Sequence, residues 1–194
     1  MPRPREFDVD TALERAMQVF WAKGYESTSL DDLCKATGVG RSSLYSAFND
    51  KRDLYLRALE HYENASAARI AAALARPAPV RKALAGFLER MIDDIVAGPG
   101  RRGCFIGNCA AELARLDRTA ATRVRRSIDR IESVFREALA RAKSRGEIPA
   151  ESDAAALARF LTAGIQGLRL VGKANPDRSA LRDVAAVMLR CLES

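Results

Sequence analysis

The chain is poor in the residues that carry enzyme chemistry or bind metal ions. Its 194 residues include one His and four Cys, and aromatic residues make up only 6% of the composition. The cysteines lack the spacing of a zinc site or a disulfide framework, and the sequence has no glycine-rich phosphate loop. The single imidazole, His61, lies within a helical pattern, and the adjacent Asp93 and Asp94 point in different directions on a helix. We therefore expect no catalytic residue, no metal site and no cofactor.

Long apolar runs are also missing. Although 48% of the residues are hydrophobic, no uninterrupted apolar segment reaches the roughly 20 residues that a membrane-spanning helix needs. The first residues lack the layout of a secretory signal peptide. We therefore expect a soluble cytoplasmic protein that does not bind membranes. The length allows one large domain, or a small head with a larger body.

The net charge of +7 does not by itself indicate a nucleic-acid partner. Residues 1–51 contain seven Lys/Arg and eight Asp/Glu, a net charge of −1, whereas residues 97–145 contain twelve and five, a net charge of +7. Single basic residues in the N-terminal part are more informative than this overall charge. Arg3 and Arg5 lie in a proline-containing arm of the kind that can reach an adjacent DNA groove or phosphate, although such arms are usually disordered.

Apolar residues recur at helical spacing along the whole chain, without strand-like alternation or repeats, so the expected fold class is all-α. N-cap residues, glycines and prolines mark the helix ends. Nine helices are expected, over about residues 10–23, 30–37, 41–48, 51–76, 80–97, 104–116, 119–145, 153–171 and 177–192. We expect a three-helix N-terminal head at residues 1–50 and a larger helical body at residues 51–194, joined by the fourth helix without a flexible linker.

Residues 28–51, TSLDDLCKATGVGRSSLYSAFNDK, have the pattern of a helix-turn-helix. Ser29 is a helix N-cap, and Asp32 follows in the first turn, where the helix dipole favours negative charge. Gly38 ends the first helix because glycine tolerates the left-handed conformation of a C-cap. Val39 is expected to be the buried residue of the turn. The second helix can then lie in a DNA major groove.

The second helix of this pair has an apolar face and a polar face. Leu44 and Phe48 lie four residues apart on the inner face. The outer face carries short polar side chains, an arginine and a tyrosine, which can reach base edges or phosphates. The predicted DNA-binding residues are Thr28, Arg41, Ser42, Ser43, Tyr45, Ser46 and Lys51. The alternative is a generic pair of packed helices with a solvated polar face.

Residues 20–59 resemble the N-terminal signature of the TetR/AcrR family of transcriptional regulators. The resemblance is carried by Phe20, Gly24, Tyr25, Thr28, Leu33, Ala36, Gly38, Val39, Leu44, Tyr45, Phe48, Lys51 and Leu54. It implies a ligand-responsive regulator, most often a repressor, that binds a near-palindromic double-stranded DNA operator as a homodimer and is released by a small-molecule effector. Family members often have His or Tyr immediately before Phe48. This sequence has Ala47 there, which predicts the loss of one DNA contact.

The last two expected helices carry apolar stripes that favour a two-fold dimer. Gly164 and Gly167 each cost about 1 kcal/mol of helix stability relative to Ala, and close approach of another helix commonly offsets such a cost. The resembling family also pairs through these two helices. The predicted interface residues are Leu161, Gly164, Ile165, Gly167, Leu168, Val184 and Met188. The alternative is that both stripes belong to the core of one subunit.

The resemblance also implies an effector pocket within the helical body. The candidate lining residues are Tyr62, Phe87, Met91, Phe105, Asn108, Cys109 and Phe135. For each of them the alternative is plain core packing, which is the commoner reason for apolar residues at helical spacing.

The segment RRGCFIGNCAAEL suggests a different kind of regulation. Cys104 is expected at a helix N-terminus beside Arg101 and Arg102, and both features stabilise a thiolate. An alternative function is therefore a redox- or electrophile-sensing repressor that uses Cys104 or Cys109. The competing interpretation is an inert, half-buried thiol.

Overall fold

The computed structural model describes residues 7–193, and this part of the chain contains nine α-helices, one 3-10 helix and no strand. The predicted all-α fold is therefore confirmed. Arg3 and Arg5 of the predicted N-terminal arm lie outside the described residues. The elements are α1 (Val9–Lys23), α2 (Leu30–Thr37), α3 (Arg41–Ala47), α4 (Lys51–Leu74), α5 (Val80–Ala97), η1 (Pro99–Arg102), α6 (Phe105–Leu113), α7 (Arg118–Ser144), α8 (Ala154–Ala174) and α9 (Arg178–Arg190).

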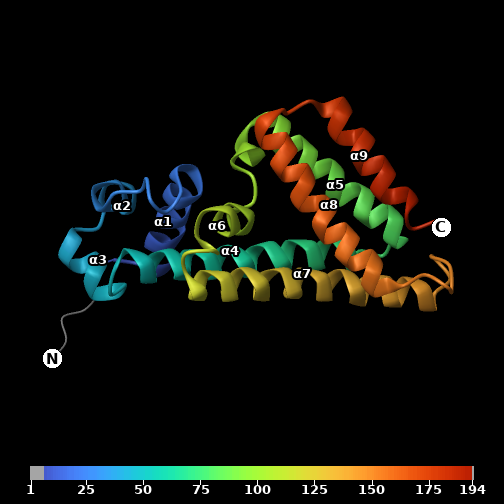
Figure 1. Ribbon diagram of the computed structural model, residues 1–194, viewed down its shortest axis with the longest axis horizontal. Helices are drawn as coiled ribbons and strands as arrows, with labels where there is room; N and C mark the ends of the chain where they lie inside the picture. The colour runs from blue at the N-terminus through green and yellow to red at the C-terminus, as the bar shows by residue number, and fades with distance from the viewer. Residues whose placement is uncertain (1–6, 194) are drawn as a thin grey trace. The chain divides into compact units, whose positions relative to one another are not determined.

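The described chain forms two compact units (Figure 1). Unit 1 contains the chain up to Ala65 together with Asn108–Val124, and unit 2 contains Ser66–Gly107 and the chain from Arg125 onward. The helices α4, α6 and α7 each contribute residues to both units. Unit 1 therefore holds more than the three N-terminal helices, because it also includes the beginning of α4, most of α6 and the beginning of α7.

Capping side chains set most of the helix starts. α1 begins slightly earlier than the sequence pattern predicts because Asp8 Oδ1 accepts the N–H groups of Asp10 and Thr11 at 2.9 and 3.1 Å. Asp153 and Asp177 cap α8 and α9 in the same way. α6 ends earlier than predicted, because the N–H groups of Leu116 and Asp117 both turn back to the Leu113 carbonyl.

Aromatic rings form the centre of unit 1. The Tyr55 ring on α4 packs edge-on against Phe20 of α1 and against Tyr25, with both centroid distances at 5.0 Å. Tyr55 is almost completely buried, and this burial raises the pKa of its phenol. The three rings therefore anchor α1 and the loop after it to α4.

Two carboxylates connect the later part of the chain to this N-terminal region. Glu112 on α6 accepts the N–H groups of Tyr25 and Glu26 at 3.0 and 2.9 Å. Asp117, which precedes α7, receives two hydrogen bonds from the Arg52 guanidinium at 2.6 and 2.8 Å. The segment Asn108–Val124 therefore belongs to unit 1. Glu112 accepts two backbone N–H groups of the α1–α2 loop, and Asp117 binds the Arg52 guanidinium.

Replacing Asp117 with asparagine is expected to lower the melting temperature at neutral pH by about 1–3 °C. Asn can still cap α7, where Asp117 Oδ1 accepts the N–H groups of Thr119 and Ala120, but the ion pair with Arg52 is lost. The effect is small because the Arg52 side chain is 47% exposed.

The Asp117 ion pair also gives this variant a defined pH dependence. The hydrogen bond from Arg52 lowers the pKa of Asp117 from 3.8 to about 2. Because the folded-state pKa is the lower one, the stabilisation is complete above about pH 4 and is lost as the pH falls through about 2. Thermal unfolding of both proteins between pH 7 and about pH 1.5 should show a stability difference that is largest above about pH 4 and shrinks toward zero as the pH falls through about 2. A difference that stays constant would contradict this origin.

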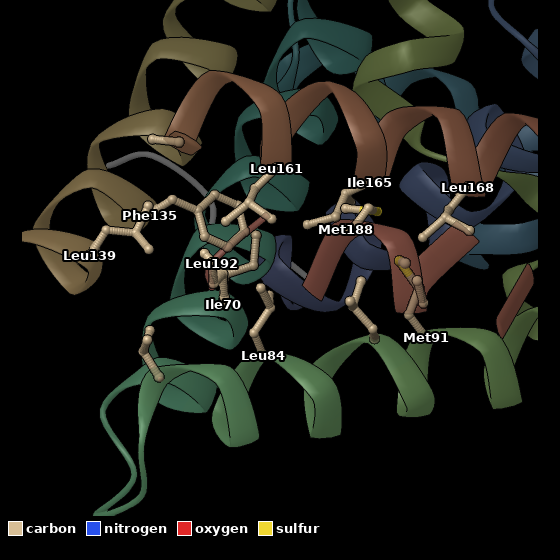
Figure 2. Packing of buried hydrophobic residues seen from close by; sticks show 14 of the residues in the cluster. Ile70, Leu84, Met91, Phe135, Leu139, Leu161, Ile165, Leu168, Met188 and Leu192 are labelled. Atoms are coloured by element: carbon tan, nitrogen blue, oxygen red, sulfur yellow. The ribbon is translucent and has the colours of Figure 1, made fainter. Parts of the chain in front are cut away.

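Unit 2 has one continuous apolar core between α5, α8, α9 and the adjoining parts of α4 and α7. Figure 2 shows Phe135 and Leu139 of α7 beside Leu161 of α8, with Leu84 of α5 and Leu192 facing the same cluster. All of these residues are at most 2% exposed. Burial of these apolar side chains is the dominant stabilising contribution to unit 2.

Among the described residues, α8 is the one helix whose length and composition would allow it to cross a membrane. Only 28% of the apolar window is buried within the structure. Core helices of proteins that never enter a membrane meet the same criterion, and α8 contributes Leu161, Ile165 and Leu168 to the core of unit 2.

Candidate functional sites

The helix-turn-helix predicted from residues 28–51 is built from local hydrogen bonds. Ser29 and Asp32 form a reciprocal capping box, with Asp32 N–H donating to Ser29 Oγ at 3.1 Å and Ser29 N–H donating to Asp32 Oδ2 at 3.0 Å. Lys23 Nζ lies 2.6 Å from Asp32 Oδ1. The hydrogen bonds from Lys23 and then Ser29 hold the pKa of Asp32 well below its usual range. The carboxylate therefore stays ionised at the N-terminus of α2.

The turn between α2 and α3 is fixed by Gly38 and Thr37. Gly38 has φ +73°, which is the left-handed conformation, and its N–H donates to the Cys34 carbonyl at 2.9 Å. The Thr37 hydroxyl donates to the Leu33 carbonyl at 2.7 Å and accepts the Val39 N–H at 3.2 Å. Val39 is buried, as the sequence predicts. These contacts set the direction in which α3 leaves the turn.

α3 exposes a polar face and buries an apolar one. Leu44 and Phe48 are each 1% exposed and attach α3 to unit 1. The predicted outer residues of α3 are all exposed: Arg41, Ser42, Ser43, Tyr45 and Ser46. Arg41 Nη2 lies 3.0 Å from Asp31 Oδ1 of α2, with both side chains largely exposed. The helix thus presents one guanidinium, three hydroxyls and a phenol to solvent.

The two predicted residues outside α3 differ from each other. Lys51 begins α4 and its Nζ lies 4.5 Å from the Tyr25 ring centroid, a cation–π contact that positions the ammonium group. Thr28 is buried, and its hydroxyl donates to the Gly24 carbonyl at 2.6 Å. The Thr28 hydroxyl therefore supports the α1–α2 loop in this structure, and its DNA contact stays a prediction.

A cavity in unit 2 has a volume of about 360 Å³ and lies between the end of α4, α5 and α8. Two of the predicted effector residues, Phe87 and Met91, line it. The cavity is otherwise lined by Ser66, Arg69, Ile70, Ala72, Ala73, Arg76, Arg90, Asp94 and Arg169.

The other predicted effector residues lie elsewhere. Phe105 and Phe135 of unit 2 are each 1% exposed and do not line this cavity. In unit 1, the Tyr62 ring packs edge-on against Trp21 with a centroid distance of 5.0 Å. Asn108 and Cys109 also belong to unit 1. None of these five residues lines the cavity. Helical periodicity marks buried positions without separating core from cavity.

The charged residues of the cavity lining are not among those predicted from the sequence. Arg90 and Asp94 are four residues apart on α5 and share a helical face, while Arg69 lies on α4 and Arg76 just after it. That spacing was a usable signal, but a search for apolar residues passes over it. Arg169 reaches the same cavity from α8, and only the tertiary fold brings it there.

The two cysteines of the alternative sensor hypothesis are both buried. Cys104 directly precedes α6, as predicted from its position at a helix N-terminus. Cys109 is completely buried, and this burial raises the pKa of its thiol. A raised pKa disfavours the thiolate, so the structure does not favour Cys109 as a reactive sensor.

The predicted dimer residues lie mostly on the inner face of α8 and α9. Leu161, Ile165, Leu168 and Met188 are part of the unit 2 core (Figure 2). A Cβ added to Gly164 would lie 2.6 Å from Met188 Cε, so this glycine serves the α8–α9 contact within one chain. The structure thus assigns these five residues to intramolecular packing. Gly167 and Val184 are exposed.

A second apolar stripe lies on the exposed side of the same two helices. We call it the outer stripe; it consists of Ala156, Phe160, Ala163, Gly167, Leu170 and Ala174 on α8 and Ala180, Val184 and Val187 on α9. The steps along it alternate between three and four residues, which is the spacing of one helix face. Phe160 and Leu170 are 41% and 70% exposed. α8 is therefore apolar on two faces, one buried and one open.

Comparison with known proteins gives matches over both parts of the chain. A family model described as bacterial regulatory proteins, tetR family, matches residues 12–58, and one described as tetracyclin repressor-like, C-terminal domain, matches residues 79–188. The HTH-type transcriptional regulator YezE of Bacillus subtilis is 34% identical over the full length of both chains. The HTH-type transcriptional repressor ComR of Escherichia coli is 33% identical over 97% of this chain and 90% of its own.

A solved structure of similar size shows such a protein on DNA. It is a cysteine mutant of the regulator CifR complexed with a 26-base-pair double-strand operator. It is 33% identical, with a TM-score of 0.82, over 97% of this chain and 98% of its own.

Proposed function

The chain belongs to the TetR family of bacterial transcriptional regulators, and we propose that it acts as a ligand-responsive repressor that binds a near-palindromic DNA operator as a homodimer. The observation that carries this proposal is the polar face of α3, which a helix-turn-helix holds out to solvent while Leu44 and Phe48 anchor the helix. We further propose that the protein works in the cytoplasm and that residues 1–50 form the functional DNA-reading head.

In this mechanism α3 enters the major groove. Arg41 provides the fork that suits a guanine edge or a phosphate, and the serines approach bases closely. Tyr45 offers its hydroxyl to a phosphate and its ring to a thymine methyl. Lys51, held over Tyr25, contacts the phosphate backbone. Binding requires the exposed Arg41–Asp31 pair to open or to share its guanidinium, which costs little because the pair is solvated.

A homodimer is part of this DNA-binding mechanism. The segment from residue 1 to residue 51 has a net charge of −1, so general attraction to phosphates is weak and affinity depends on two heads binding together. A two-fold dimer places its recognition helices about 34–36 Å apart, or somewhat further, to meet successive major grooves. We propose that the outer stripe of α8 and α9 is the dimer interface, because two helices per subunit form a four-helix contact around a two-fold axis.

Effector binding is proposed to occur in the cavity of unit 2. The helices α4, α6 and α7 each continue from unit 2 into unit 1, so a ligand that shifts them changes the elements that support the head. Glu112 is the direct link, since its carboxylate accepts two backbone N–H groups of the α1–α2 loop. The effector can alter operator affinity only by its difference in affinity for the two states.

Tyr45→Ala and Lys51→Ala are each expected to weaken operator binding about tenfold to a hundredfold, because each removes a base or phosphate contact. Lys51→Ala should also reduce the salt dependence of binding by about one released counterion. The measurement is a gel shift or anisotropy titration at several salt concentrations with the DNA that flanks the protein's own gene.

Control variants separate recognition from folding. Tyr45→Phe keeps the ring and should retain part of the affinity, and Lys82→Ala removes an exposed lysine of α5 and should have no effect. Circular dichroism should show wild-type helix content in all four proteins. Wild-type affinity in both Tyr45→Ala and Lys51→Ala would exclude α3 as the reading helix.

A further inference from the structure

The lining of the unit 2 cavity combines positively charged and apolar side chains. Four arginines line it, from three segments of the chain: Arg69 and Arg76 from α4 and just after it, Arg90 from α5 and Arg169 from α8. A single acid, Asp94, faces them. Four guanidinium groups against one carboxylate leave the lining with a net charge of +3.

The apolar part of the lining gives the ligand its second property. Ile70, Phe87 and Met91 line the same cavity, together with the methyl groups of Ala72 and Ala73. A volume of about 360 Å³ lies near the lower end of the roughly 300–1,000 Å³ usual for small-molecule sites. The space therefore fits a small molecule with an apolar body.

We propose that this cavity binds an amphipathic anion, with a carboxylate or phosphate head held by the arginines and a short apolar body against Phe87, Met91 and Ile70. The proposal rests on the proposed effector role of the cavity and names the ligand class. Arginine suits such a head because its planar fork donates two parallel hydrogen bonds to a carboxylate or phosphate.

The position of Arg169 supports this chemistry. Its Nε donates to the Met91 Sδ at 3.4 Å, and a thioether is a weak acceptor. An oxyanion entering the cavity offers the same N–H a much stronger acceptor, so binding improves the hydrogen bonding of Arg169 while Met91 remains available for apolar contact. A cationic ligand would instead face four like charges.

Four probes of equal chain length test the ligand class: octanoate, octyl phosphate, 1-octanol and octylamine. Isothermal titration and thermal shift of the full-length protein should show binding of one or both anions and at least tenfold weaker binding of the alcohol and the amine. Comparison of octanoate with octyl phosphate identifies which oxyanion the arginines prefer. Equal or tighter binding of octanol or octylamine would overturn the proposal, and so would the absence of binding by both anions.

Variants that change the charge of the cavity lining test where the anion binds. Removing an arginine should weaken binding, and removing the carboxylate should tighten it. Arg90→Gln and Arg169→Gln should each weaken binding of the preferred anion about tenfold or more, because each removes a charged hydrogen bond. Asp94→Asn removes the one like charge and should tighten binding by about threefold. Arg136→Gln, an exposed arginine of α7 that does not line the cavity, is the matched control. Unchanged binding in both cavity arginine variants with a folded protein would place the anion elsewhere and contradict the proposal.

Measuring operator binding in parallel separates the proposed repressor function from the proposed ligand class. If the wild type binds its operator but neither anion, the regulator proposal stands and the ligand class is wrong. If an anion binds with the expected variant pattern but operator binding cannot be found, the ligand class stands and the proposed repressor function fails.

Discussion

Replacing Phe135 with alanine is expected to lower the free energy of unfolding by about 3–5 kcal/mol. The Phe135 ring is 1% exposed and lies among Leu139, Leu161 and other core residues of unit 2 (Figure 2). Removing it loses the transfer free energy of the ring and leaves a void that the packed helices fill only in part. Urea unfolding followed by circular dichroism measures the loss, at one fixed protein concentration because the proposed dimerisation would contribute to stability.

Phe87→Ala is the matched control for this substitution. Phe87 is also a phenylalanine of unit 2, but it is only partly buried and lines the cavity. Its replacement should cost clearly less stability than the Phe135 replacement and should weaken binding of an amphipathic anion. The reverse result, a stable Phe135→Ala protein with altered ligand response, would return Phe135 to the effector site where sequence reasoning first put it.

The parts of the molecule that sequence predicts well are those determined locally. Helix starts follow from caps such as Ser29 and Asp153, whose partners lie two or three residues away. The reading helix is equally local, because Leu44 and Phe48 define its inner face and the intervening polar residues its outer face. Those contacts need no knowledge of the remaining fold.

The predictions of the dimer interface and of the cavity lining depend on which element packs against a given helix face. α8 has two apolar faces, and periodicity alone favours the one containing Leu161 and Ile165, which the structure uses for its own core. Phe160 and Leu170 stand on the other face. Likewise, Arg169 joins Arg90 at one cavity only because α8 packs beside α5. The sequence alone therefore does not show which apolar face of α8 is buried in the core or which arginines meet at the cavity.

Long-range polar contacts are the hardest features to predict from one sequence. The bond from Tyr25 N–H to Glu112 joins residues 87 positions apart. Nothing near Glu112 in the sequence signals that its carboxylate satisfies the α1–α2 loop. This contact nevertheless joins the Asn108–Val124 segment to the α1–α2 loop within unit 1.

Gly167→Arg is expected to weaken homodimerisation by at least about a hundredfold while leaving the fold of each subunit intact. Gly167 is exposed, and a Cβ added to it would meet no atom within 4 Å. The subunit by itself therefore gains nothing from glycine here, although glycine costs about 1 kcal/mol relative to Ala in a helix. In the proposed dimer, close approach of a partner helix would offset that cost, and a two-fold axis would bring two introduced arginines into the same interface.

Two measurements test the Gly167→Arg substitution: the oligomeric state of the protein and its affinity for the operator. Sedimentation velocity or light scattering over a range of concentrations should show the Gly167→Arg protein as a monomer where the wild type is a dimer. Operator affinity should fall by about a hundredfold or more, because a single acidic head has lost the effective concentration supplied by its partner. Gly167→Ala should give a milder loss of dimer affinity with equal or higher helix stability.

Gly164 provides the control that separates dimerisation from folding. A Cβ at Gly164 would lie 2.6 Å from Met188 Cε of the same chain, so Gly164→Ala requires the flexible end of Met188 to shift. The helix-propensity gain of about 1 kcal/mol from Gly to Ala offsets that cost, and stability should change by about 1 kcal/mol or less. Its folded subunits should still associate, because the added methyl group points into the core and not toward a partner. If Gly167→Arg remained a dimer and bound the operator with wild-type affinity, the outer stripe could not be the dimer interface. The exposed apolar residues of the outer stripe would then have to bind something other than a second copy of the chain.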